Sequence, residues 1–347
     1  MFGWSVNGPS IVNEPTSIQV VTHFISANVI EQQVRSLWNI ENEGLCSDLS
    51  MSPNDEKVIQ FWDEKIQSLD GHYVLPIPFK NDIQIHNNFD VADSRLRSLN
   101  RSLCKKGLFN RYGCEMVKMF DKGYAEKVPD DQIDREDKVW YLPHHGVLNA
   151  KKPDKLRIVF DCAARFLGES LNDKCLQGPD LNNRLLNVLL RFRQHQFAIM
   201  ADVEAMYYQV RVESDDRDVL RFLWYDCDGN VVQYRMTSHV FGGIWCACVA
   251  TYALRHTIKD FPECDKLIVD TVMKAFYVDD CLKAVESRDD AVRVIEGTKS
   301  LLSKSGFNLT KFIVNDTELL EMIPVDDRAK EVKDFHSDMN SKALGVK

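Results

Sequence analysis

The spacing of hydrophobic residues changes along the chain from a helical period to the alternation that is typical of β-strands. Near the N-terminus, Val58, Trp62 and Ile66 recur about every fourth residue, which predicts an amphipathic helix. A second stretch of helical spacing covers residues 90–122 and is interrupted at Gly107. Because glycine commonly ends a helix, we expect two helices there.

Strand-like patterns dominate from residue 139 onward. Alternation with a period of two, or short β-branched runs bounded by turn residues, predicts strands. These runs are residues 139–143, 146–149, 155–160, 197–202, 220–225, 230–236, 267–278, 282–285 and 307–314. Residues 73–79 also alternate, but Pro76 and Pro78 lack backbone donors and favour an edge strand or an extended connection.

Three further helices are expected between these strands. Asp180 can cap a helix whose leucines fall within residues 185–192. A glycine pair precedes an alanine-rich segment that ends near His256. Ser287 begins a capping box, followed by a helix that stops at Gly306. Helices and antiparallel strands together predict an α+β fold, with a mainly helical N-terminal region.

Overall charge argues against a nucleic-acid partner, whereas one local window is compatible with it. The chain has 347 residues, enough for two or three domains, and a formal net charge of −9. Residues 90–122, however, contain eight Lys and Arg residues and only four Asp and Glu residues. Such a basic segment is more commonly a solvated helical face. The more specific alternative is that it contacts the phosphate backbone of a nucleic acid.

Cysteine usage and hydropathy indicate an intracellular protein that does not enter a membrane. Ten cysteines include no C-x-x-C pair, and Cys246 and Cys248 lie in an apolar run without clustered histidines. Reduced, buried thiols are therefore favoured over a zinc site or a disulfide framework. No secretory segment follows Met1, and no uninterrupted apolar stretch reaches the roughly 18 residues that a spanning helix needs.

Three carboxylates lie at the ends of predicted strands. Asp279 and Asp280 follow the strand-like run that ends at Val278, and Asp202 ends the run 197–202. A solvated turn and a helix N-cap are the modest interpretations. Acids reached by separate strands also provide the hard oxygen ligands that paired Mg²⁺ ions prefer. Two such ions, about 3.5–4 Å apart, promote an in-line displacement in which a 3′-hydroxyl attacks and pyrophosphate leaves.

Basic residues gather on the hairpin predicted around residue 152. Lys151, Lys152, Lys155 and Arg157 come close together there, and alternation places the last two on one face. Such a hairpin suits a triphosphate or a nucleic-acid backbone, although an exposed charged hairpin explains it equally well. Lys311, on the last predicted strand, is by default a surface lysine.

Several stretches together resemble a known family. Residues from about 139 to 347 resemble the fingers and palm of a retroelement reverse transcriptase. Their local sequence motifs are similar to those of BEL/Pao long-terminal-repeat retrotransposons. The matching stretches are WYLPHHGVL, LRIVFDCAA, SLND, GPDL, MADVEAMYYQV, the FG of VFGG, YVDD, GFNLTKF and ALGVK. GWSVNGP near the start resembles the tail of the aspartic protease of such an element.

The resemblance implies a role for each matching residue. The metal site would comprise Asp202, Val203, Asp279 and Asp280. Nucleotide binding would fall to Lys152, Arg157, Tyr207, Phe241 and Gly242. Among these, Arg157 would hold the incoming triphosphate and Tyr207 would form an aromatic gate against a ribose 2′-hydroxyl. Lys311 would protonate pyrophosphate as a general acid, alongside the catalytic acids. Leu344 and Gly345 would begin the primer grip.

The same resemblance divides the chain and implies its architecture. Residues 1–24 would be a remnant of the protease tail, and residues 25–138 a mainly helical spacer and the start of the fingers. Residues 139–347 would form the fingers and palm of a right-hand polymerase, ending at the primer grip without thumb, RNase H or integrase. The antiparallel palm sheet would be backed by helices.

The implied activity is RNA-directed DNA polymerisation within a Pol polyprotein. It requires two Mg²⁺ ions, with Mn²⁺ as a substitute, a primed RNA or DNA template and dNTPs. The expected location is a cytoplasmic virus-like particle.

The sequence also departs from the resembled pattern. Cys246-Ala247 replaces the family's usual Ser-Pro, and Val240 stands where proline is common. The alternative is an inactive or domesticated remnant that only binds nucleic acid. An aspartic protease is the least favoured of the three functions, because its active-site motif Asp-Ser/Thr-Gly does not occur in the sequence.

Overall fold

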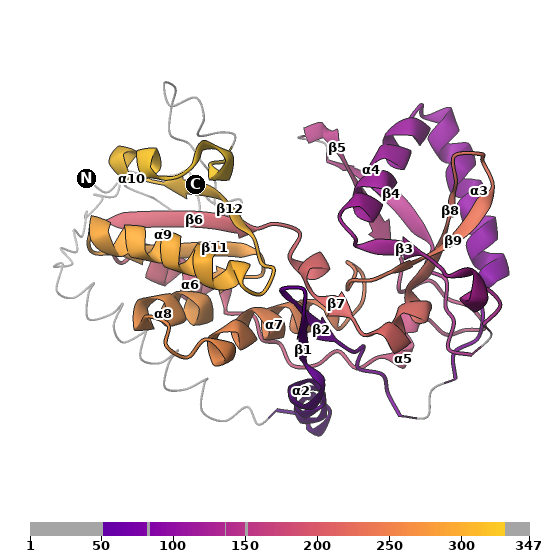
Figure 1. Ribbon diagram of the computed structural model, residues 1–347, viewed down its shortest axis with the longest axis horizontal. Coiled ribbons are helices and arrows are strands. Elements are labelled where there is room, and N and C mark those ends of the chain that lie inside the picture. The colour runs from indigo at the N-terminus through magenta and orange to yellow at the C-terminus, as the bar shows by residue number, and fades with distance from the viewer. Residues whose placement is uncertain (1–50, 82–83, 136, 150–151, 330–347) are drawn as a thin grey trace, which may run out of the picture. The chain divides into compact units, whose positions relative to one another are not determined.

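The computed structural model mixes helices and sheets, so the predicted α+β class is confirmed (Figure 1). It describes residues 51–81, 84–135, 137–149 and 152–329. Predictions that lie outside the described residues concern the protease remnant, the first part of the spacer, one lysine of the basic hairpin and the primer grip. They fall on residues 1–24, residues 25–50, Lys151, Leu344 and Gly345.

The central sheet has four antiparallel strands. Its order is β10 (Phe276–Tyr277), β11 (Asp280–Val285), β6 (Phe197–Val203) and β12 (Leu309–Val314) (Figure 1). Along β6, Ile199, Ala201 and Val203 are buried and their neighbours only partly so. This period of two shows that one face of the strand is covered more completely than the other.

Helices cover the central sheet. α9 (Arg288–Ser303) contacts β6, β11 and β12, and it also packs on α8 (Lys266–Lys274) and α7 (Cys246–Asp260) (Figure 1). α6 (Leu185–Phe192) contacts β10 and β11. The side chain of Ser287 caps α9 as its sequence predicts. These helices hold the strands that carry the predicted acids.

A second sheet and two helices form an aromatic core. The sheet order is β3 (Ala125–Lys127), β9 (Val231–Met236) and β8 (Arg221–Tyr225). The two helices expected on either side of Gly107 are α3 (Phe89–Lys105) and α4 (Phe109–Asp121). The ring of Tyr112 on α4 lies 5.0 Å from that of Trp224 on β8. Residues on both sides of position 138 therefore share one core.

The predicted basic hairpin is formed by β4 (His144–Asn149) and β5 (Lys152–Phe160). His144 anchors it to the core: its Nδ1 lies 2.7 Å from the Tyr112 hydroxyl and its Nε2 lies 2.9 Å from the Leu223 carbonyl. Burial lowers the pKa of His144 to about 4. The imidazole is therefore neutral near pH 7.

A buried ionic network holds the second sheet to the loop before it. Arg221, which is fully buried, donates from Nε to Asp218 Oδ1 at 3.0 Å, and Arg235 donates to the same oxygen at 3.1 Å. Arg221 also donates to the Ile133 carbonyl at 3.1 Å. Burial alone would raise the pKa of Asp218, but Arg221 and Arg235 outweigh it and hold that pKa below its usual range.

The remaining elements are short, apart from one helix. α2 (Pro53–Lys65) precedes a three-stranded sheet in the order β1 (Gln67–Leu69), β2 (His72–Leu75) and β7 (Arg211–Val212). Two further helices are α5 (Leu171–Lys174) and α10 (Thr317–Met322), and 3₁₀ turns cover Asp130–Gln132, Met206–Gln209, Ser214–Leu220 and Val325–Asp327. No helix in the described ranges is long and apolar enough to cross a membrane.

The largest error of the sequence prediction concerns residues 267–278, for which the pattern predicts a strand. Most of that run is helix α8, and only Phe276 and Tyr277 form a strand. The Asp265 side chain accepts a hydrogen bond from the Leu267 backbone at 2.8 Å and caps the helix. Buried residues at helical spacing then outweigh the strand preference of β-branched side chains. The expected hairpin survives as β10 and β11.

Three smaller expectations are also corrected. Residues 139–143 form no strand beyond an isolated bridge at Tyr141. Asp180 does not cap α6, because its carboxylate accepts from the Asn182 backbone at 3.0 Å and the helix begins at Leu185. The helix expected to continue past Lys65 ends there, with Ile66 as its C-cap and Gln67–Leu69 as strand β1. The last two errors lie at an element boundary, where local pattern is least informative, whereas the first removes a whole predicted strand.

Candidate active site

Sheet register brings the three predicted acids to one end of the central sheet. Asp280 on β11 pairs directly with Asp202 on β6, and Asp279 lies in the turn just before β11. Directly opposed residues in an antiparallel pair place their side chains on the same face. The Val203 amide donates to the Asp279 carbonyl at 2.8 Å. The buried end of β6 is therefore tied to the acidic turn.

Backbone strain gathers around the same point. Val278, immediately before the acids, has φ +55°, and Lys311 on β12 has φ +55°. Ala205, three residues after Asp202, has φ +51°. The left-handed region is unfavourable for residues with a Cβ and most of all for a β-branched one. Strain of this kind persists only where surrounding structure enforces it, and it is common at functional sites.

The acids perturb one another. Burial raises the pKa of Asp280 to about 6, with further contributions from the negative charges of Asp279 and Asp202. Burial, and then Asp202, raise the pKa of Asp279, whereas Lys311 and Arg157 act in the opposite direction. A carboxyl group with a raised pKa lacks compensating positive charge. The acidic end of the sheet would thus gain from a nearby cation.

Lys311 is not the solvated surface lysine that its sequence position suggests by default. Its Nζ lies 2.8 Å from Asp202 Oδ2, although half of its side chain remains exposed. The register of β12 against β6 shifts between Thr310 and Ile313, so Lys311 lies in a bulge. Bulges redirect a side chain relative to a regular strand. Lys311 is therefore part of the acidic cluster, through its ion pair with Asp202.

The donor set fits a hard divalent cation of the Mg²⁺ type. Its oxygens come from Asp202, Asp279 and Asp280. Val203 follows Asp202 in the chain, and its amide donates to the Asp279 carbonyl. Across the described residues, no three His, Cys, Asp or Glu side chains converge closely enough to hold an ion by themselves. Mg²⁺ does not require this, because it usually takes one or two carboxylates and fills its shell with water and substrate phosphates.

The basic hairpin places positive charge within electrostatic reach of the acids. Arg157 and Lys155 on β5 are exposed, and Leu156 and Ile158 between and after them are buried. The charge of Arg157 acts to lower the pKa of Asp279, against the larger effect of burial. Lys152 begins β5, but its side chain lies outside the described residues.

Two aromatic rings from distant segments meet beside the acids. The Tyr207 and Phe241 ring centroids are 4.3 Å apart, edge to face. Tyr207 is half-buried, and burial, followed by the charges of Cys246 and Asp279, raises the pKa of its hydroxyl. Phe241 is 41% exposed, which is unusual for so large an apolar ring. An exposed aromatic pair next to an acidic site offers a stacking surface for a planar ligand.

Gly242 needs its lack of a side chain. Its φ is +121°, and a Cβ at this position would lie 2.5 Å from the Phe160 carbonyl oxygen at the end of β5. The Phe160 carbonyl therefore leaves no room at this position for a residue that has a Cβ. Among the residues that depart from the resembled pattern, Val240 and Cys246 are buried and Ala247 is partly buried. They fill the core beneath the loop.

Two interacting residues near the site escape prediction from sequence. Asn172, which lies in the SLND stretch but receives no role from the sequence, donates to the Gly242 carbonyl at 3.1 Å and accepts from the Ile244 amide at 3.0 Å. Glu204, two residues after Asp202, pairs with Lys122 at 2.8 Å. Lys122 is the main cause of the lowered pKa of Glu204. Neither contact has a signal in a local sequence window, because the partners are distant in the chain.

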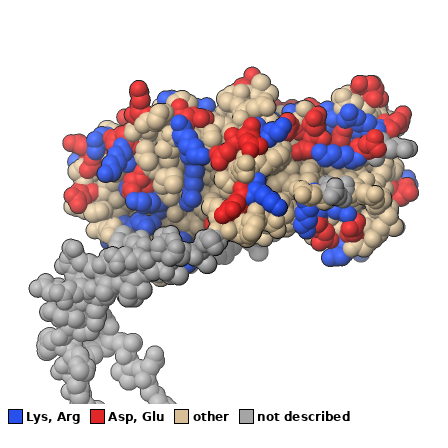
Figure 2. All heavy atoms as spheres, turned by 90° about the horizontal axis from the view of Figure 1, so that it is seen from below, with Lys and Arg blue, Asp and Glu red and all other residues tan. Residues whose placement is uncertain are grey.

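Charge on the surface is mixed. On the face drawn in Figure 2, basic and acidic side chains interleave over the described part of the chain. Within the basic window, Arg97 pairs with Asp93 at 2.8 Å and Lys118 pairs with Glu115 at 2.7 Å. Such exposed pairs contribute little stability, but they reduce the net positive charge of the helical surface.

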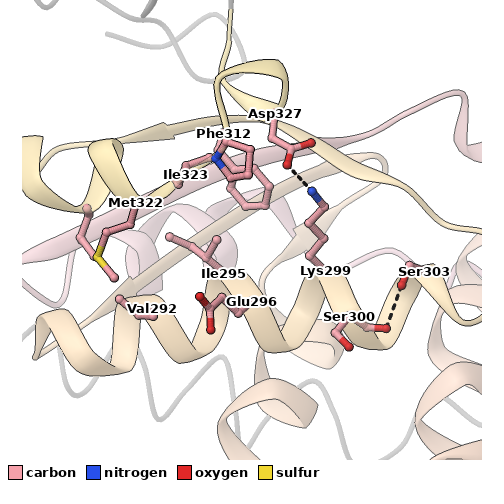
Figure 3. A pocket seen from close by; sticks show the side chains of 12 residues that line it. Val292, Ile295, Glu296, Lys299, Ser300, Ser303, Phe312, Met322, Ile323 and Asp327 are labelled. Carbon is pink, nitrogen blue, oxygen red and sulfur yellow. Dashed lines mark hydrogen bonds and ion pairs between the residues drawn. The ribbon is translucent and has the colours of Figure 1, made fainter.

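A cavity within the described part of the chain lies away from the acids. It has a volume of about 420 Å³ and is lined by α9, β12, α10 and the turn after it. Val292, Ile295 and Met322 line its apolar part, and Lys299 pairs with Asp327 at one side (Figure 3). None of its lining residues belongs to the acidic turn or to the aromatic pair.

No protein-family model matches the chain, and no curated protein matches it. Among solved structures, it matches foamy viral protease-reverse transcriptase in complex with double-stranded DNA, with 14% identity and a TM-score of 0.43, over 86% of this chain and 44% of that one. A complex of the foamy viral enzyme with RNA/DNA hybrid matches with 12% identity and a TM-score of 0.44, over 86% and 34%. A crystal structure of the prototype foamy virus protease-reverse transcriptase matches with 14% identity and a TM-score of 0.42, over 84% and 32%. The chain spans less than half the length of these proteins.

Proposed function

We propose that the chain is an RNA-directed DNA polymerase domain that extends a primer with dNTPs. The observation that carries the proposal is the direct pairing of Asp202 with Asp280 on neighbouring strands, with Asp279 in the adjoining turn. Paired acids beside a basic hairpin and an exposed aromatic surface suit a substrate that combines phosphates with a planar base. Nucleotidyl transfer is a reaction class that uses this combination.

The residues of the chain would divide the work. Asp202, Asp279, Asp280 and the Val203 backbone would hold Mg²⁺ or Mn²⁺, which lowers the charge of the phosphates and activates the primer hydroxyl. Arg157 is exposed and would bind triphosphate oxygens through its planar fork.

Four further residues would act on the nucleotide or on its leaving group. Tyr207 and Phe241 would lie against the sugar and base, and Gly242 would let the loop approach closely. The Lys311 ammonium, 2.8 Å from Asp202 and half exposed, would give its proton to the departing pyrophosphate.

The finer assignment rests on the sequence stretches that resemble BEL/Pao elements. On that basis we propose that the chain is part of a Pol polyprotein, with residues 139–347 as fingers and palm. Primer, template, dNTPs and the rest of Pol would be its partners, and a cytoplasmic virus-like particle its location. A remnant that binds nucleic acid without turnover is the outcome that the following experiment would reveal instead.

Primer extension tests the proposal. The chain would be incubated with oligo(dT) annealed to poly(rA), dTTP and Mg²⁺, beside Asp279→Asn and the control Asp289→Asn. Asp289 is an exposed acid in the first turn of α9. We expect extension by the wild type and by the control. Asp279→Asn should lose about 100-fold or more, the scale seen when one group that stabilises transition-state charge is removed.

Equal background extension by all three proteins would contradict polymerase activity. Binding of the primed template, measured in parallel by fluorescence anisotropy, then identifies a non-catalytic nucleic-acid-binding remnant. Extension on a DNA template but not on RNA would contradict the RNA-directed assignment alone.

A further inference from the structure

One side chain connects the segment after β5 to the glycine loop of the candidate site. The carboxamide of Asn172 donates from Nδ2 to the Gly242 carbonyl at 3.1 Å and accepts from the Ile244 amide at 3.0 Å. It thus bonds to backbone groups on both sides of Gly243. A planar amide that uses its donor and its acceptor on one loop fixes both the position and the orientation of that loop.

Asn172 is itself held in place. It lies in α5, where Ser170 and Asp173 form a reciprocal capping box. The Asn172 amide donates to the Cys162 carbonyl at 3.1 Å, which links α5 to the chain just after β5. The carboxamide is therefore presented by a short but well-bonded turn.

The loop that Asn172 holds carries the aromatic surface. Gly242 passes so close to the Phe160 carbonyl that no Cβ fits, and its φ of +121° is accessible mainly to glycine. Phe241 precedes it and touches Tyr207 edge to face at 4.3 Å between ring centroids. A continuous path of contacts therefore leads from Asn172 through the loop to the ring beside Asp279.

We propose that Asn172 is a positioning residue for the incoming nucleotide. It acts through Gly242 and Ile244, and it keeps Phe241 at the place where the base and sugar of a deoxynucleoside triphosphate would lie. This inference rests on the proposed function. It adds a residue that touches neither the nucleotide nor the metal.

Hydrogen exchange reads the loop directly. In Asn172→Ala the Ile244 amide loses its acceptor, and its exchange should accelerate about tenfold, the equivalent of one hydrogen bond of roughly 1.4 kcal/mol. Asn172→Asp keeps an acceptor for Ile244 but removes the donor to Gly242, so Ile244 should stay protected. Asn230→Ala serves as the control, because Asn230 holds a turn at the remote β8–β9 loop. Unchanged Ile244 exchange in Asn172→Ala would overturn the inference.

Steady-state kinetics test the consequence for the nucleotide. Both Asn172 variants should raise the KM for dTTP three- to tenfold, with kcat within twofold of the wild type. A merely structural role would lower the melting temperature and leave KM unchanged, and that result would also overturn the inference. If Asn172→Ala does not fold, Asn172→Asp still decides, because it keeps the acceptor for Ile244 and replaces the donor to Gly242 by a carboxylate oxygen that repels the Gly242 carbonyl.

Failure of the inference differs from failure of the proposed function. In the first case the wild type extends primers and both Asn172 variants keep its KM. In the second case the wild type does not extend primers at all, and no nucleotide remains to be positioned. Both outcomes are read in the same assay.

Discussion

Adding a methyl group at Gly242 should destabilise the protein more than the same change at any unconstrained glycine with positive φ. The new Cβ would lie 2.5 Å from the Phe160 carbonyl oxygen, well inside van der Waals contact. That oxygen belongs to backbone, so it cannot swing away as a flexible side chain would. The backbone conformation adds about 1–3 kcal/mol, and relieving the overlap about 1–2 kcal/mol more.

Gly229→Ala is the matched control for Gly242→Ala. Gly229 has φ +84° in the β8–β9 turn, and nothing lies within 4 Å of the place that a methyl group would take there. It therefore measures the backbone term without the overlap. Urea denaturation of the two variants should differ by about 1.5 kcal/mol, or about 0.5 M in midpoint for a slope near 3 kcal/mol/M.

The loop offers a second readout of Gly242→Ala. Because Phe160 cannot yield, the strain should move the loop and separate Phe241 from Tyr207, now 4.3 Å apart between ring centroids. The KM for dTTP should then rise in Gly242→Ala and not in Gly229→Ala. Equal stability of the two variants, together with an unchanged KM, would refute the reasoning from the Phe160 contact.

Two further predictions concern the stability of the fold. Burial lowers the pKa of His144 and of His239 to about 4, against 6.5 for an ordinary histidine. At these two positions the unfolded chain binds more protons between these values, so the histidines should reduce urea stability as pH falls from 6.5 to 4, by up to about 3 kcal/mol each. The raised pKa of Asp280 acts in the opposite direction, so the comparison is made in the Asp280→Asn variant, in which unchanged or greater stability at pH 5 than at pH 7 would contradict the prediction. Asp218→Ala leaves the fully buried Arg221 without its carboxylate and should cost about 3–5 kcal/mol in the same assay. Asp228→Ala, in an exposed turn, should cost almost nothing, and equal costs would show that the buried network is dispensable.

Sequence pattern predicts two strands of the central sheet well, because burial alternates along β6 and, apart from the bulge at Lys311, along β12. β6 and β12 lie close to their expected bounds, since each has one well-covered face and a clear turn beside it. The pattern fails at α8. Ile268, Thr271 and Val272 prefer strands by propensity, yet they are the buried positions of a helix that Asp265 caps. Burial at helical spacing determined that this segment is a helix, and residue propensity alone does not predict that burial.

The candidate site divides in the same way. Asp202 is predictable because it lies near the end of β6, a strand that can be read from its own window. The run before Asp279 and Asp280 is mostly helix α8, so for these two acids only the expected hairpin, formed by β10 and β11, is right. The pairing of Lys311 with Asp202 depends on a bulge in β12, which no local pattern announces. The contact of Asn172 with Gly242 joins positions 70 residues apart. Such contacts arise only when the chain has folded, so they cannot be read from either segment alone.

The register between β11 and β6 connects the stability of the fold to the position of the acids. Cys281 pairs with Ala201, and both are buried. A slip of one residue would expose this pair and turn Asp280 toward the covered face, because side chains alternate along a strand. The hydrogen bond from Val203 to the Asp279 carbonyl, at 2.8 Å, opposes the same slip. The hydrophobic alternation that closes the core therefore also places Asp280 opposite Asp202, and the acids need no separate device to bring them together.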